Sequence, residues 1–186
     1  MKKHIIFAHS AGAQDGPGKG SYDLVAYLRA ELGEEFEIHY PILEDPEAPT
    51  DEMWQSLLSK AFRERGNDEC VLIGHSLGGS SLLKYLSERN SDIKIAGLFL
   101  IAAPYWGEED WNVEEYKLAK NFAEKLPEIP SMQLFHCQDD PIVPFNHAHV
   151  YKKALPQAKL HALNGDSHAF TNGLPELVDA IRNLRK

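Results

Sequence analysis

Little in this sequence is typical of a secreted, nucleic-acid-binding or membrane protein. Of its 186 residues only 2 are cysteine, each in a separate apolar run, so neither a disulfide framework nor a zinc site is predicted. The 19 basic residues are outnumbered by 28 acidic ones, and the net charge of −9 disfavours nucleic acid and anionic membranes as partners. The apolar run at residues 5–8 is too short for a signal peptide, and no run is long enough to span a bilayer. We therefore expect a cytoplasmic protein.

The hydrophobic content is ordinary, and it is arranged in a regular order. With 43% hydrophobic residues and no linker, repeat or low-complexity segment, residues 1–186 are expected to form a single domain. Short apolar runs alternate with segments of helical period, which is typical of an α/β fold with a mostly parallel sheet. Six strands are expected, at residues 4–8, 36–40, 69–73, 95–102, 131–137 and 159–163. The expected helices include one over residues 113–126, one that Asp51 caps, and one over residues 146–154.

The third expected strand runs directly into Gly74-His75-Ser76-Leu77-Gly78 and then into a helix. These residues match the pattern G-x-S-x-G in the strand, turn and helix context of a nucleophile elbow. So tight a turn strains the backbone at the serine, and it needs small residues two positions before and after. It exposes the Ser76 hydroxyl at the helix N-terminus, where the amide of Leu77 can donate to an oxyanion. The alternative is an ordinary turn with Ser76 as a helix cap.

A serine nucleophile needs a base, and its partners are expected at the ends of later strands, in the order serine, acid, histidine. Asp139 and Asp140 follow the fifth strand, and we select Asp140 because it stands directly before a Pro-Ile-Val-Pro turn. His168 follows the sixth strand and is the expected general base. His75, the neighbour of the serine, is expected to form hydrogen bonds beneath the elbow and not to act as the base.

Two further groups of residues are candidates for contacts with a substrate. The loop after the first strand is expected to supply a second oxyanion donor, the backbone amide of Ala11 or, alternatively, that of Ser10. Aromatic residues gather after the fourth strand, where they either belong to the core or form the wall of an acyl pocket. They include Tyr105, Trp106 and Trp111.

Two other patterns suggest sites that we do not expect. Residues 12–19 resemble a phosphate-binding loop, but that pattern requires glycine at position 13 and Ser or Thr at position 20, where the chain has Ala13 and Gly20. His147 and His149 suggest a metal site, but residues two apart on a helix diverge, so both are expected on the solvated surface. Neither a nucleotide nor a metal ion is predicted.

The elbow at 74–79, the turn at 140–144 and the loop of His168 together resemble the α/β-hydrolase superfamily over nearly the whole chain. The compact length and the loop at 41–49, which leads into the helix of Trp54, resemble small serine hydrolases of the retinoblastoma-binding protein 9 type. The resemblance implies a three-layer α/β-hydrolase-like fold, a triad of Ser76, Asp140 and His168, and no metal or organic cofactor. No insertion after the fourth strand is large enough for a separate lid domain.

These features predict a serine hydrolase that cleaves a carboxylic ester or thioester through an acyl-enzyme intermediate. In the absence of a lid, the expected partner is a small-molecule ester with a short acyl group, or an acylated macromolecule. The same residues can also serve amide or peptide hydrolysis. A protein-interaction module on a hydrolase scaffold is a further alternative, because a fold does not determine a function.

Overall fold

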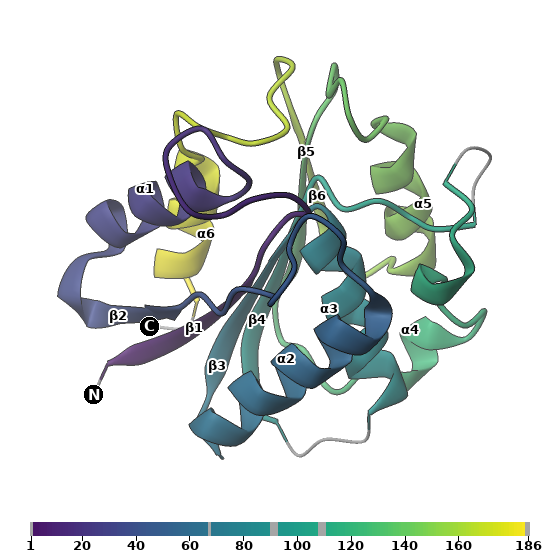
Figure 1. Cartoon of the computed structure of the whole chain (residues 1–186), viewed down its shortest axis with the longest axis horizontal. Helices are drawn as coiled ribbons and strands as arrows, with labels where there is room; N and C mark the ends of the chain where they lie inside the picture. The colour runs from purple at the N-terminus through teal and green to yellow at the C-terminus, as the bar shows by residue number, and fades with distance from the viewer. Residues whose placement is uncertain (1, 67, 90–92, 108–110, 185–186) are drawn as a thin grey trace.

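The computed structural model describes residues 2–66, 68–89, 93–107 and 111–184, which form three layers around one sheet (Figure 1). The strands are β1 (Lys3–Ala8), β2 (Phe36–His39), β3 (Cys70–His75), β4 (Ile95–Ile101), β5 (Met132–Cys137) and β6 (Lys159–Leu163). They pair in the order β2-β1-β3-β4-β5-β6, and every pair is parallel. The predicted six-stranded parallel sheet is therefore confirmed.

Helices cover both faces of this sheet. They are α1 (Tyr22–Leu32), α2 (Asp51–Arg65), α3 (Leu77–Glu88), α4 (Phe122–Lys125), α5 (Asn146–Ala154) and α6 (Pro175–Arg182), with 3-10 turns η1 (Gly33–Glu35) and η2 (Glu114–Tyr116). Helices α1 and α6 pack on one face, whereas α2, α3 and α5 pack on the other (Figure 1). In the described part of the chain, no helix is long and apolar enough to cross a membrane.

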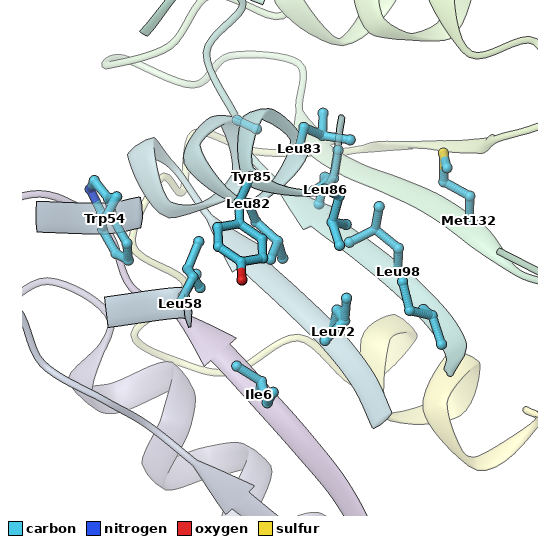
Figure 2. Close-up of a cluster of buried hydrophobic side chains, with 14 of the residues drawn as sticks. Ile6, Trp54, Leu58, Leu72, Leu82, Leu83, Tyr85, Leu86, Leu98 and Met132 are labelled. Atoms are coloured by element: carbon cyan, nitrogen blue, oxygen red, sulfur yellow. The ribbon is translucent and has the colours of Figure 1, made fainter. Parts of the chain in front are cut away.

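Successive residues of a strand point to opposite faces, so the strands contribute to two separate apolar clusters. On β1, Ile6 joins the cluster under α2 and α3, whereas Ile5 and Phe7 join the cluster under α1 and α6. Figure 2 shows the first cluster, in which Ile6, Leu72 and Leu98 of three adjacent strands face the helices. The helix side chains labelled there are Trp54, Leu58, Leu82, Leu83, Tyr85 and Leu86. Because both faces are covered, the inner strands β3 and β4 are apolar almost throughout, whereas the edge strands β2 and β6 also carry polar residues.

The chain leaves all six parallel strands at the same edge of the sheet. The loops after β1, β5 and β6 meet at this edge, at the top of Figure 1. Strand β3 lies inside the sheet, and only Ser76 stands between its end and the start of α3. The N-terminus of α3 is therefore placed among these loops, at the edge where α/β proteins hold their ligand sites.

The helix expected over residues 113–126 is not continuous. The chain forms only η2 and α4 there, and residues 117–121 between them are not helical. Tyr116 and Phe122 are both buried in the cluster that contains α3. On one continuous helix, residues six positions apart point about 120° away from each other, so both rings could not face the sheet. Burial of the two rings outweighs the helix propensity of the segment.

The helix expected to be capped by Asp51 is capped by the preceding residue instead. Thr50 has an extended backbone, and its hydroxyl accepts a hydrogen bond from the amide of Met53 at 3.2 Å. Asp51 is the first helical residue, where its negative charge suits the helix dipole. The expected strands, and the helix expected at 146–154, match the observed bounds to within two residues at each end.

Candidate active site

The backbone of Ser76 adopts a strained conformation at the turn between β3 and α3. Its φ of 52° and ψ of −125° lie in a region that residues with a side chain rarely adopt. The conformation is held by the neighbouring strand, because the Ser76 amide donates to the carbonyl of Ile101 at 2.8 Å. The predicted sharp turn between strand and helix is present, with the serine at its apex.

Two glycines make this turn possible because backbone atoms approach them too closely for a side chain. A Cβ at Gly74 would lie 2.5 Å from the Cα of Gly79. A Cβ at Gly78 would lie 2.4 Å from the carbonyl oxygens of Ala8 and His9, at the end of β1. The glycine spacing that the sequence shows is therefore a packing requirement, which lets α3 begin directly against β1.

Ser76, His168 and Asp140 form one continuous chain of hydrogen bonds. The Oγ of Ser76 lies 3.0 Å from Nε2 of His168, and Nδ1 of His168 lies 2.8 Å from Oδ2 of Asp140. A carboxylate only accepts hydrogen bonds, so Nδ1 carries the proton and Nε2 is left to accept from the serine hydroxyl. The structure thus brings together the three residues that the sequence selected as nucleophile, acid and base.

Asp140 is held as a buried anion. Its side chain is fully buried, and its second oxygen accepts hydrogen bonds from the amides of Ile142 and Val143 at 2.8 and 3.0 Å. Burial acts to raise the pKa of Asp140, but the hydrogen bond and charge of His168 and the two amides outweigh it and lower the pKa below its usual value. The neighbouring Asp139 is exposed to solvent, so Asp140 is the carboxylate that reaches the histidine.

His75 connects three of the loops at this edge. Its Nε2 donates to the carbonyl of His168 at 2.8 Å, and its Nδ1 accepts from the hydroxyl of Ser21 at 2.7 Å. Burial, with a smaller contribution from His168, lowers the pKa of His75 to about 3, so the ring stays neutral. As predicted, His75 forms hydrogen bonds beneath the elbow, and it holds the backbone of the histidine loop in place.

The two candidate oxyanion donors on the loop after β1 differ in availability. Ala8 pairs with Gly74 across the sheet, so the loop that follows β1 emerges beside the elbow. The amide of Ser10 already donates to the hydroxyl of Ser21 at 2.9 Å. Ala11 is exposed, and among the described hydrogen bonds its amide has no acceptor. Of the two donors, the amide of Ala11 is therefore the one without an acceptor among the described hydrogen bonds. The amide of Leu77 lies in the first turn of α3, where backbone N–H groups have no partner within the helix.

The aromatic residues after β4 are half-buried and border the first turns of α3. The indole Nε1 of Trp106 donates to the hydroxyl of Ser80 at 2.9 Å, and its ring packs against those of Trp111 and Tyr116. The ring of Tyr105 packs instead against residues of the core. Tyr105 and Trp106 pack against the core, as one of the two expectations had it, and all three residues are half-buried. The acyl pocket stays a prediction.

One histidine was expected on the surface and is buried. Nδ1 of His147 accepts a hydrogen bond from the amide of Tyr105 at 2.9 Å, and the ring of Trp111 packs edge-on against it. The expectation for His147 was wrong because helix position alone does not reveal that the loop after β4 covers this end of α5. His149 is exposed as expected. Among the described residues, no three His, Cys, Asp or Glu side chains are grouped so that they could bind a metal ion.

Sequence reasoning missed three polar residues that support the site. His136, on β5, donates from Nε2 to the carbonyl of Val143 at 2.8 Å and so braces the turn that binds Asp140. Ser21 joins His75 to the loop after β1, and Gln14 lies buried within that loop. None of these residues belongs to a motif. Only their long-range contacts identify them.

A parallel sheet between helical layers, with a strained serine at a strand-to-helix turn and a histidine and acid from later strands, defines the α/β hydrolases. The chain has this fold and this arrangement. The sequence model of the family described as Serine hydrolase matches residues 31–174, and the chain belongs to this family. The finer resemblance to proteins of the retinoblastoma-binding protein 9 type stays a prediction. A comparison with curated protein sequences found no significant match.

Solved structures share the fold at low sequence identity. The ydeN gene product of B. subtilis is 18% identical, with a TM-score of 0.76 over 99% of this chain and 98% of that one. A carboxylesterase structure from Nitrososphaera gargenis is 14% identical, with a TM-score of 0.71 over 97% and 89% of the two chains. XC6422 from Xanthomonas campestris, described as a serine hydrolase without lid, is 17% identical, with a TM-score of 0.66 over 97% and 79%.

Proposed function

We propose that this serine hydrolase cleaves carboxylic esters or thioesters with Ser76 as its nucleophile. The observation that carries the proposal is the unbroken hydrogen-bond chain from Ser76 Oγ through both ring nitrogens of His168 to Asp140. The chain leaves Nε2 free to take the serine proton, and the buried carboxylate stabilises the imidazolium that results. This arrangement turns a weakly nucleophilic hydroxyl into a reactive one.

The reaction proceeds in two acyl-transfer steps. Ser76 Oγ attacks the carbonyl carbon while its proton moves to His168 Nε2, and the carbonyl oxygen becomes an oxyanion. The intermediate collapses, the alcohol or thiol leaves with the proton from His168, and the acyl group stays on Ser76 as an ester. Water then attacks this ester with its proton taken by His168, and the carboxylic acid departs as the proton returns to Ser76.

Backbone amides are proposed to stabilise the oxyanion in both steps. The amide of Leu77 stands at the N-terminus of α3, where the helix dipole favours negative charge. The amide of Ala11 is proposed as the second donor, from the loop beside the elbow. Donors of this kind each contribute about 10²–10³-fold to the rate in enzymes that form an oxyanion.

The proposed substrate has a short acyl group or carries its acyl group on an exposed part of a larger molecule. The described residues between β4 and β5 form only η2 and α4, which are too small to make a separate lid. One structural relative is described as lacking a lid, and another is a carboxylesterase. Trp106 and Trp111 are proposed to form one wall for the acyl group, because they border the first turns of α3.

Labelling with a fluorophosphonate, followed by measurement of the intact mass, tests the nucleophile. We expect a single adduct on the wild type and none on Ser76→Ala, because only an activated serine reacts rapidly. Ser87→Ala, near the other end of α3, provides the control, since the one hydrogen bond described for its side chain goes to the carbonyl of Lys84. This control should be labelled like the wild type. A wild type that stays unlabelled would contradict the proposal and favour an interaction module.

Matched substrates test the proposed bond. The nitrophenyl ester and the nitroanilide of one short acid present the same acyl group and differ only in the bond that breaks. We expect the wild type to cleave the ester at least about 100-fold faster. Equal rates would show an amidase instead of an esterase, and the Ser76→Ala variant gives the background for both reactions.

A further inference from the structure

The peptide between Ser10 and Ala11 is held from one side by two hydrogen bonds. The carbonyl oxygen of Ser10 accepts from Nδ1 of His9 at 2.6 Å and from Nε2 of Gln14 at 2.9 Å. This peptide bond is trans, so its carbonyl and its amide point in opposite directions. Whatever holds the carbonyl of Ser10 therefore also sets the direction of the Ala11 amide.

The side chain of Gln14 is itself fixed in one orientation. It is buried, and its amide nitrogen donates to the carbonyls of Ser10 and Gly12, the latter at 2.6 Å. Its oxygen accepts from the amide of Ser21 at 2.8 Å and from the hydroxyl of Tyr40 at 2.6 Å. A flipped amide would set its NH₂ group against the amide of Ser21, so only one assignment satisfies all four contacts.

Gly20 leaves the space that this glutamine occupies. A Cβ at position 20 would lie 2.0 Å from Nε2 of Gln14 and 2.4 Å from its Cδ. The backbone of Gly20 also has a φ of 52°, which disfavours a residue with a side chain. The glycine that excludes a phosphate-binding loop at this position is thus part of the packing around Gln14.

We propose that Gln14 is a positioning residue that directs the amide of Ala11 toward the oxyanion. The inference rests on the proposed function of Ser76 and extends it to a residue outside any motif. None of the described hydrogen bonds of Gln14 involves Ser76. It acts through the carbonyl of Ser10, and Tyr40 and Ser21 keep its own amide in place.

A donor that meets the oxyanion only in the transition state affects kcat and leaves substrate binding unchanged. We therefore expect Gln14→Leu to lower kcat about 10–100-fold with KM within about twofold, since the donor is misdirected and not removed. Tyr40→Phe loses one of the bonds that hold Gln14, so kcat should fall by less, about threefold. A boronic acid, which mimics the oxyanion, should lose affinity in each variant by the same factor as kcat.

Gln133→Leu is the matched control. Gln133 is half-buried near the start of β5, away from the carboxyl edge, and its side chain bonds to Ser131 and His161. This control removes a comparable network, so kcat and boronate affinity should stay at the wild-type values. If Gln14→Leu does not fold, the graded loss in Tyr40→Phe decides the question.

The two proposals fail in different ways. A wild type without activity or labelling would overturn the role of Ser76. An active wild type whose Gln14→Leu variant folds and keeps its kcat and boronate affinity would overturn the role of Gln14 alone. A Gln14→Leu variant that changes only KM would overturn it as well, because a direct substrate contact would then explain the effect.

Discussion

The Oγ of Ser76 lies 3.0 Å from Nε2 of His168, although the two residues are 92 positions apart in the chain. They follow β3 and β6, which are separated in the sheet by β4 and β5. Three strand spacings amount to about 14 Å, so the loop after β6 must reach back across the edge of the sheet. The hydrogen bond from His75 to the carbonyl of His168 anchors this loop where it meets the elbow.

The two adjacent aspartates after β5 should differ sharply in their effect on activity. We expect Asp140→Asn to lower kcat about 10³–10⁴-fold, because an amide no longer selects the tautomer with a proton on Nδ1 of His168. Asp139→Asn, at the exposed neighbour, should stay within about twofold of the wild type. Steady-state kinetics with a short-chain ester measure both. A kcat of Asp140→Asn within about twofold of the wild type would show that the hydrogen bond from His168 to Asp140 does not matter for catalysis.

The contact of Gly78 with the end of β1 predicts a loss of both stability and activity on adding one methyl group. In Gly78→Ala the new Cβ would lie 2.4 Å from the carbonyl oxygens of Ala8 and His9, so α3 or β1 must shift. We expect the free energy of unfolding to fall by about 1–3 kcal/mol and kcat to fall with it. Gly16→Ala is the control, because a Cβ there meets no atom within 4 Å. Urea denaturation that shows equal stability for both variants would contradict the close packing.

Two buried histidines predict that stability falls in mild acid. Burial lowers the pKa of His9 to about 4, and burial with the nearby His168 lowers the pKa of His75 to about 3. Both rings stay neutral in the folded protein at pH 5, whereas in the unfolded chain they take up protons below about pH 6.5. The unfolded state therefore binds more protons, and the free energy of unfolding should fall by about 2 kcal/mol per histidine between pH 6.5 and 5.

Substitution of His9 separates its contribution to the pH dependence of stability from the contributions of the other titratable groups. His9→Asn cannot take up this proton, so its loss of stability between pH 6.5 and 5 should be smaller than that of the wild type by about 2 kcal/mol. The exposed His149→Asn should keep the wild-type dependence. Urea denaturation at both pH values measures the difference. A wild-type slope in His9→Asn would mean that the buried ring is protonated in the folded state.

The proposed acyl wall predicts a change in chain-length preference. Trp111→Ala removes an apolar surface beside Trp106, so kcat/KM for a hexanoate ester should fall about tenfold relative to that for an acetate ester. Val113→Ala, in the same loop but exposed, should leave the ratio unchanged. Kinetics on an ester series from acetate to octanoate measure it. A constant ratio in Trp111→Ala would assign this ring to the core alone.

Local sequence patterns alone determine the strands, the parallel sheet and the elbow of this protein. Continuous apolar runs predict strands that are buried on both faces, and alternation with helical segments predicts a parallel sheet, because both depend on nearby residues. The elbow could be predicted for the same reason, since its glycine spacing is a pattern of five residues, although the close approach of Gly78 to the end of β1 is a long-range contact. Chain order then pointed to His168, because parallel strands bring their carboxyl ends to one edge.

Contacts between distant segments determined the features that local patterns could not predict. The helix expected over residues 113–126 is interrupted because Tyr116 and Phe122 are both buried. On one continuous helix, the two rings could not both point into the core. Of the amides of Ser10 and Ala11, that of Ser10 is occupied because it donates to the hydroxyl of Ser21. The order of residues in the chain does not reveal this contact. Gln14 carries no local signal, since its four hydrogen bonds exist only after the loop closes. Periodicity and spacing therefore determine the elements and their order, whereas the direction of each hydrogen bond at the site follows from tertiary packing.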